Sequence, residues 1–60
     1  MDKLLLTVDE AAEALGLSRW KLYALLRSGR LRSVKLDGSR RIAASALTEF
    51  VETLEEGYVA

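Results

Sequence analysis

The stretch Thr7–Gly29, TVDEAAEALGLSRWKLYALLRSG, decides the fold, because it contains the start and stop signals of two helices. Thr7 and Glu10 have the capping-box spacing, in which each side chain satisfies an amide group at a helix start. Gly16 ends this first helix, and Ser18 then supplies a good N-cap for a second helix. The glycine that closes the stretch is a typical left-handed terminator, so the second helix runs to about residue 28. Two helices joined this closely predict a helix-turn-helix motif.

The remainder of the chain predicts a hairpin followed by a third helix. Residues 31–42 alternate apolar and polar side chains on either side of Asp37-Gly38, a dipeptide typical of hairpin turns. Residues 44–55 have the apolar spacing of an amphipathic helix, carried by Leu47, Phe50, Val51 and Leu54. The expected fold class is mainly α with a small β-hairpin, a winged helix-turn-helix in the order α-α-β-β-α. We expect residues 1–60 to form one such domain.

The loop length of the hairpin decides which side chains share a face, since one residue of register change swaps the faces. A two-residue loop places Val34 and Leu36 beside Arg41. An odd loop with a bulge instead places Val34, Arg40 and Ile42 together. We expect the odd loop, because it lets Val34 and Ile42 reach the core together and leaves Lys35 and Arg41 facing water or a ligand.

The composition argues against several function classes. The chain has 60 residues with no cysteine and no histidine, so thiol chemistry, the usual soft metal ligands and the commonest general base are missing. We therefore expect no enzymatic activity, no metal and no cofactor. Leu4–Leu6 and the longer hydrophobic run Leu22–Leu26 are both far too short for a membrane span. A cytoplasmic protein of a bacterial cell, associated with the nucleoid, fits best.

The formal net charge of zero conceals two opposite poles. Residues 19–41 contain eight basic residues and one acid, Asp37, for a net charge of +7. The remainder contains Lys3 and eight acidic residues, for a net charge of −7. The field that steers a polyanion depends on the local patch and decays within roughly 10 Å. The central segment is therefore suited to binding double-stranded DNA.

One face of the second helix combines aromatic and basic side chains. At about 100° per residue, its leucines share the buried side, and Trp20 and Arg27 lie opposite. The second helix of a helix-turn-helix enters the major groove with its N-terminal residues leading. The candidate recognition-helix residues are Ser18, Arg19, Trp20, Lys21, Tyr23 and Arg27, and the candidate wing residues are Lys35, Arg40 and Arg41. Arginine pairs with guanine edges or phosphates, hydroxyls donate to phosphate, and an indole contacts a thymine methyl or the sugar–phosphate wall.

Structural roles compete with these assignments. Exposed basic residues are often only solvated, and Trp20 has an alternative role in packing over the hairpin. The basic residues as a group favour DNA, because eight of the nine positive charges are clustered. Arg30 and Arg32 instead favour a structural role at the carboxyl end of the second helix.

The third helix carries the acidic residues Glu49, Glu52, Glu55 and Glu56, which would repel DNA, so this helix should face away from the duplex. They form a solvated face or, in our alternative hypothesis, dock on the basic pole of a neighbouring copy. Such a head-to-tail contact generates an open filament along DNA.

Several segments together resemble a known family: LTVDEAAEALGLSR at 6–19, LRSG at 26–29 and RRI at 40–42, with Leu22-Tyr23 and Ala46-Leu47. The chain is similar over about residues 4–54 to the excisionase family of winged helix-turn-helix domains, related to the DNA-binding domain of MerR-type regulators. The resemblance implies that Ser18, Arg19, Lys21 and Tyr23 read the major groove. It also implies that Lys35, Arg40 and Arg41 follow the adjacent minor groove or backbone.

Family members of this length resemble recombination directionality factors of phages and integrative elements. The resemblance implies cooperative binding and bending of attachment-site DNA, which biases a tyrosine or serine integrase toward excision. The alternatives are a small transcriptional regulator or repressor and, from another class, an antitoxin or adaptor module anchored by Trp20 and Tyr23. Salt dependence separates these classes, since a DNA binder contacting about five phosphates has a log–log slope near −4 to −5.

Overall fold

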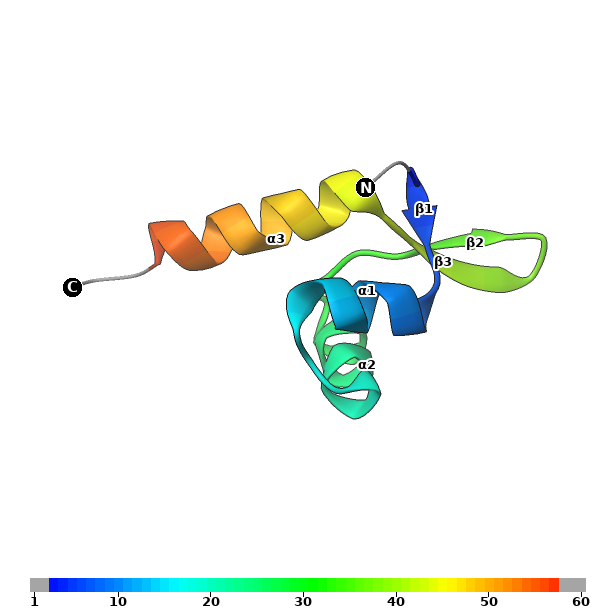
Figure 1. The fold of residues 1–60 in the computed structure, drawn as a ribbon, viewed down its shortest axis with the longest axis horizontal. Helices are drawn as coiled ribbons and strands as arrows, with labels where there is room; N and C mark the ends of the chain where they lie inside the picture. Colours follow the sequence, from blue (N-terminus) through cyan, green and yellow to red (C-terminus); the bar gives the residue numbers. More distant parts are fainter. Residues whose placement is uncertain (1–2, 58–60) are drawn as a thin grey trace.

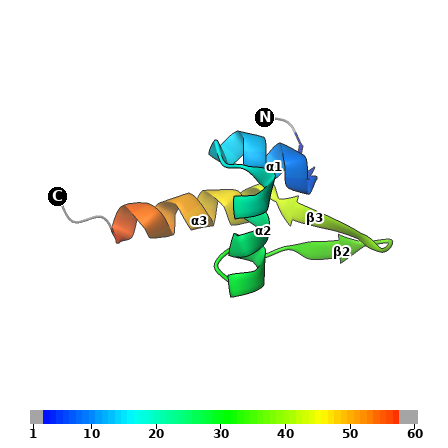
Figure 2. The ribbon, with the colours of Figure 1, turned by 90° about the horizontal axis from the view of Figure 1, so that it is seen from below.

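The computed structural model describes residues 3–57 and contains three helices and a small antiparallel sheet (Figure 1). In chain order the elements are β1 (Leu5–Leu6), α1 (Val8–Leu15), α2 (Arg19–Ser28), β2 (Val34–Leu36), β3 (Ser39–Ala43) and α3 (Ala44–Glu56). The predicted order α-α-β-β-α is confirmed, with one short strand added at the start. The β2–β3 hairpin and α3 leave the body in opposite directions, as both Figure 1 and Figure 2 show.

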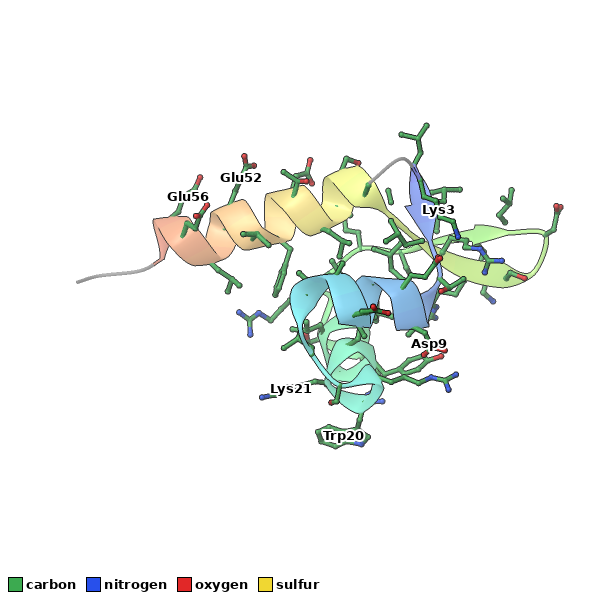
Figure 3. All side chains as sticks on the ribbon, viewed as in Figure 1. Lys3, Asp9, Trp20, Lys21, Glu52 and Glu56 are labelled. Atoms are coloured by element: carbon green, nitrogen blue, oxygen red, sulfur yellow. The ribbon has the colours of Figure 1, made fainter. Side chains whose placement is uncertain are left out.

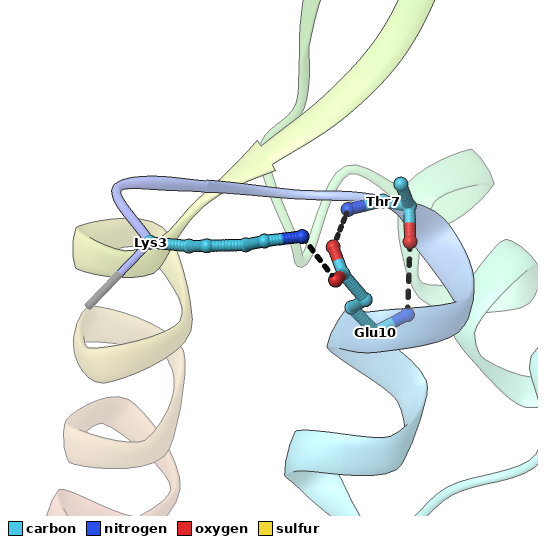
Figure 4. Close-up of polar contacts among 3 residues, drawn as sticks. All are labelled: Lys3, Thr7 and Glu10. Carbon is cyan, nitrogen blue, oxygen red and sulfur yellow. Dashed lines mark hydrogen bonds and ion pairs between the residues drawn. The ribbon is translucent and has the colours of Figure 1, made fainter. Parts of the chain in front are cut away.

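The helix boundaries follow the predicted capping signals. The Thr7 hydroxyl accepts a hydrogen bond from the Glu10 N–H at 3.1 Å, and the Glu10 carboxylate accepts one from the Thr7 N–H at 2.9 Å (Figure 4). The Ser18 hydroxyl accepts from the Lys21 N–H at 3.1 Å and so caps α2. Gly16 and Gly29 end the two helices with φ of 71° and 79°, a left-handed conformation that glycine adopts without steric penalty.

The core lies where α1, α2 and α3 meet the root of the sheet. Leu6, Leu22 and Ile42 are its largest completely buried side chains. Ala11 and Ala12 of α1 are buried, and α1 packs against both α2 and β3. Two alanines at this contact allow the backbones to approach closely.

The apolar stripe of α3 is buried only in its first half. Leu47 and Phe50 are buried, but Val51 and Leu54 remain 39% and 48% exposed. The difference arises because α3 extends beyond the other elements (Figure 2). The periodicity therefore predicted the helix correctly, but the helix is longer than the core that it covers.

The predicted odd hairpin loop is wrong. Val34 pairs with Arg41 and Leu36 with Ser39, so the loop contains only Asp37 and Gly38. Both loop residues have positive φ, 52° and 80°, as in a type I′ turn, whose twist matches that of the flanking strands. No bulge is then needed, and Val34 stays 48% exposed instead of reaching the core.

Ile42 reaches the core without Val34 because a different strand pairs with it. β1 lies antiparallel to β3, with Leu6 directly opposite Ile42. The sheet therefore has the strand order β1-β3-β2. The Ala44 N–H donates to the Leu4 carbonyl at 2.8 Å and extends this pairing. The sequence analysis missed β1, since two residues are too few to show an alternating pattern.

Candidate nucleic-acid interface

The first turn of α2 presents an exposed aromatic and basic surface. Trp20 is 74% exposed and points away from the body of the molecule at the end of α2 (Figure 3). The alternative in which Trp20 packs over the hairpin is therefore wrong. Ser18 and Lys21 are also exposed, and the Ser18 hydroxyl, which accepts from the helix, retains its own hydrogen for donation. An indole this exposed adds little to the stability of the isolated protein.

Arg19 is held from two sides. Its Nε lies 3.3 Å from the Oδ1 of Asp9 on α1, and its guanidinium carbon lies 5.8 Å from the centre of the Tyr23 ring. The side chain of Tyr23 and then the negative charge of Asp9 raise the pKa of Arg19 further above its high ordinary value. Tyr23 itself is half-buried and packs against the core, so it offers Arg19 a firm support.

Arg27 continues the exposed side of α2 into its last turn. Within residues 3–57, neither Arg27 nor Lys21 takes part in a salt bridge. Both side chains therefore remain available to phosphates along the length of the helix.

The two-residue loop separates the wing residues onto two faces. Arg40 lies two positions before the buried Ile42 in β3, and Lys35 pairs directly with Arg40, so both project from the face that α1 covers at its root. α2 in turn packs on α1. Arg41 lies on the opposite face beside Val34 and donates to the Arg40 carbonyl at 3.0 Å. The odd loop was expected to place Lys35 on the same face as Arg41, whereas the structure places it on the same face as Arg40.

The Lys35–Arg40 pair is unfavourable for the hairpin itself. Like charges directly opposite each other in an antiparallel pair destabilise it. Both side chains are exposed, and neither forms a salt bridge with another residue of the described range. A phosphate bound between them would relieve this repulsion, which supports a role in binding an anion.

Arg30 and Arg32 contact α3 instead of the carboxyl end of α2. Arg32 forms an ion pair with Glu49, and the Arg30 guanidinium carbon lies 6.0 Å from the centre of the Phe50 ring. The structural role expected for these residues is thus supported, but the partner element differs. These two cations belong to the junction with α3.

The acidic side chains of α3 lie away from the first turn of α2. α3 contains four glutamates and no basic residue. Glu52 and Glu56 point away from Trp20 and α2 in Figure 3. That α3 also faces away from a bound duplex stays a prediction.

The amino-terminal side of α1 holds a second charged contact. The Lys3 ammonium donates to the Glu10 carboxylate at 2.5 Å (Figure 4). This bond, together with the bond from the Thr7 N–H, lowers the pKa of Glu10. Glu10 therefore serves the capping of α1 and is not part of the basic surface.

The described residues contain no pocket and no cluster of acidic side chains arranged to hold a metal ion. No helix among them is long and apolar enough to cross a membrane.

Comparison with known proteins agrees with this geometry. The family described as "Helix-turn-helix domain" matches residues 5–55. An excisionase of Streptomyces ambofaciens is 44% identical over 48 residues, which cover 80% of this chain and 77% of that protein. The chain belongs to the excisionase family of helix-turn-helix proteins.

A second excisionase relative is longer than this chain. A probable excisionase of Saccharopolyspora erythraea is 45% identical over 53 residues, which cover 88% of this chain but only 54% of that protein. The chain thus spans about half the length of this relative. No solved structure matches the chain. The excisionase family is a class of DNA-binding proteins and not of enzymes, as expected from the composition.

Asp9 is the residue of this surface that the sequence analysis missed. It is ten positions from Arg19 and lies on a different helix, so no local spacing connects the two residues. The contact between Asp9 and Arg19 depends on the angle between α1 and α2, which only the folded turn between the two helices sets.

Proposed function

We propose that this excisionase binds double-stranded attachment-site DNA sequence-specifically and promotes the excision of a phage or mobile element by an integrase. The observation that carries the proposal is that two exposed basic elements, the first turn of α2 and the Lys35–Arg40 pair, accompany a hairpin that leaves the body in the direction opposite to α3. The acidic α3 lies at the other end of the molecule. A single duplex can therefore meet both basic elements without approaching the glutamates.

In the proposed complex, α2 enters the major groove with its first turn leading. Arg19 faces a guanine edge, Trp20 contacts a thymine methyl or the groove wall, and Ser18 donates to a phosphate. Lys21, Tyr23 and Arg27 line the remaining groove and backbone. The wing follows the adjacent minor groove or phosphate row through Lys35 and Arg40, whereas Arg41 lies on the opposite face of the hairpin.

The proposed assembly on DNA is cooperative and head-to-tail. The acidic pole of α3, with the half-exposed Val51 and Leu54 beside it, is complementary to the basic pole of a neighbouring copy. Such contacts do not close on themselves and would extend along tandem sites, bending the DNA as they accumulate. A tyrosine or serine integrase is the proposed second partner of the assembled complex.

Self-association is tested with the double variant Glu52→Lys/Glu55→Lys. Its affinity for a duplex with one site should equal that of the wild type, whereas cooperative binding to a duplex with several sites should be lost. Cooperativity that survives the charge reversal would count against the head-to-tail contact.

The primary experiment recovers and sequences the fragments that the protein binds from sheared genomic DNA of its source organism. Tandem direct repeats beside an integrase gene or attachment site are the expected result. A lone inverted repeat at a promoter would instead indicate a transcriptional regulator, and no enrichment would redirect the search to a protein partner.

The salt dependence on a recovered fragment gives a second test. We expect a log–log slope near −4 to −5 for about five phosphate contacts. Arg27→Ala should reduce the magnitude of this slope by about 0.9, since it removes one phosphate contact. Arg32→Ala is the matched control, because Arg32 is paired with Glu49 and should leave the slope unchanged.

A further inference from the structure

The Asp9–Arg19 ion pair joins the first turn of α1 to the first turn of α2. The two side chains are 69% and 66% exposed, and an ion pair so open to solvent contributes very little to folding stability. Arg19 is the first residue of α2, where the helix dipole disfavours a cation, and the first turn of α2 contains no acid of its own. Asp9 supplies the missing negative charge from the neighbouring helix. This contact lies at the amino-terminal end of α2, the part of the helix that we propose meets DNA.

Asp9 and Tyr23 restrict the Arg19 side chain from two sides. Asp9 engages Nε at 3.3 Å, and the Tyr23 ring lies 5.8 Å from the guanidinium carbon. The ion pair with Asp9 is made through Nε, whereas the two terminal nitrogens lie at the far end of the guanidinium. These nitrogens form the fork that pairs with O6 and N7 of guanine. An arginine held in this way loses little rotamer freedom when it binds a base edge.

The same carboxylate weakens contacts that carry no sequence information. A mobile arginine at a helix start reaches any nearby phosphate, and such contacts supply most non-specific affinity. With Asp9 beside it, the charge of Arg19 is partly neutralised, and an approaching phosphate also meets a carboxylate. The effect acts on every sequence, whereas the benefit of a positioned fork is gained only where a guanine faces it.

We propose that Asp9 is a positioning residue that increases sequence discrimination by restraining Arg19. This inference rests on the proposed function, because it concerns how the same surface distinguishes one duplex from another.

The test uses Asp9→Asn, which removes the charge and keeps the size of the side chain. Glu13→Gln is the matched control, since Glu13 is an exposed acid on α1 that forms no salt bridge with a described residue. Each variant is titrated against two duplexes of equal length and composition. One is selected from a random library by the wild-type protein, and the other is a shuffled version of it.

Asp9→Asn should bind the shuffled duplex more tightly than the wild type does. The ratio of its affinity for the selected duplex to its affinity for the shuffled duplex should fall about 5-fold. Its salt slope on the shuffled duplex should steepen by about 0.9, as one more phosphate contact forms. Glu13→Gln should leave the ratio of affinities unchanged. A purely structural role for Asp9 would instead weaken the binding of both duplexes together.

The same change in an Arg19→Ala background isolates the mechanism, at a salt concentration low enough for all variants to bind. Asp9→Asn should then leave the ratio unchanged. An equal fall in both backgrounds, or equal effects of Asp9→Asn and Glu13→Gln, would overturn the inference and leave the proposed function intact. A wild-type protein that binds both duplexes equally would overturn the proposed function and this inference with it.

Discussion

Removing Lys35 and Arg40 from the wing should change the salt dependence of DNA binding by a calculable amount. Each phosphate contact contributes about −0.9 to the log–log slope on B-form DNA, so the double variant Lys35→Ala/Arg40→Ala should lose about 1.8 in magnitude. At 0.1 M salt, a change of 1.8 in slope corresponds to about 60-fold weaker binding. The wild-type and variant lines should converge near 1 M salt, where counterion release no longer favours binding.

The assay is fluorescence anisotropy with a labelled duplex recovered from the genomic selection, titrated at four or more salt concentrations. Arg41→Ala is the internal comparison, because Arg41 lies on the opposite face of the hairpin and already donates to the Arg40 carbonyl. We expect its slope to stay within about 0.3 of the wild type, a third of one phosphate contact. A loss at Arg41 as large as that of the double variant would refute the assignment of the DNA-facing side of the wing from strand register.

Three further predictions concern single residues. Trp20→Ala should leave the thermal unfolding temperature nearly unchanged, because the indole is 74% exposed, but should weaken DNA binding, and the wild-type tryptophan emission should shift on adding DNA. Leu22→Ala should destabilise the fold by roughly 2–5 kcal/mol and leave much of so small a domain unfolded by circular dichroism, whereas Val51→Ala should be mild. Because the pKa of Glu10 is lowered in the folded state, its stabilising effect is complete above the unfolded value of about 4.3 and is lost as the pH falls through the folded value. Glu10→Gln should therefore lose less stability than the wild type between pH 6 and pH 3 in chemical denaturation, and an equal loss would exclude Glu10 as a source of the acid sensitivity.

The basic surface and the acidic helix also suggest how a chain of zero net charge binds a polyanion. Ionic screening confines the field of each charged group of residues to its surroundings. DNA at the basic surface is therefore repelled only weakly by the glutamates of α3. Arg30 and Arg32 connect the two poles through Phe50 and Glu49. The basic surface available to DNA therefore excludes Arg30 and Arg32, although both belong to the basic segment 19–41.

The sequence by itself determined the three helices, the turn between the first two and the position of the hairpin. Thr7, Gly16, Ser18 and Gly29 act through hydrogen bonds and backbone conformations within a few residues, so their meaning does not depend on the rest of the fold. The candidate recognition residues followed from the same local logic, since the leucines of α2 define its buried side and thereby its exposed side.

Only the tertiary structure decided the pairing of β1 with β3, the face of each wing residue and the contact between Asp9 and Arg19. Leu6 reaches Ile42 across 36 positions of chain, and this contact buries Ile42 without help from Val34. The alternating pattern of the hairpin was compatible with both registers, and the turn conformation at Asp37 and Gly38 selected one of them. These features depend on packing and pairing between segments that are distant in the sequence, which no local pattern of residues encodes.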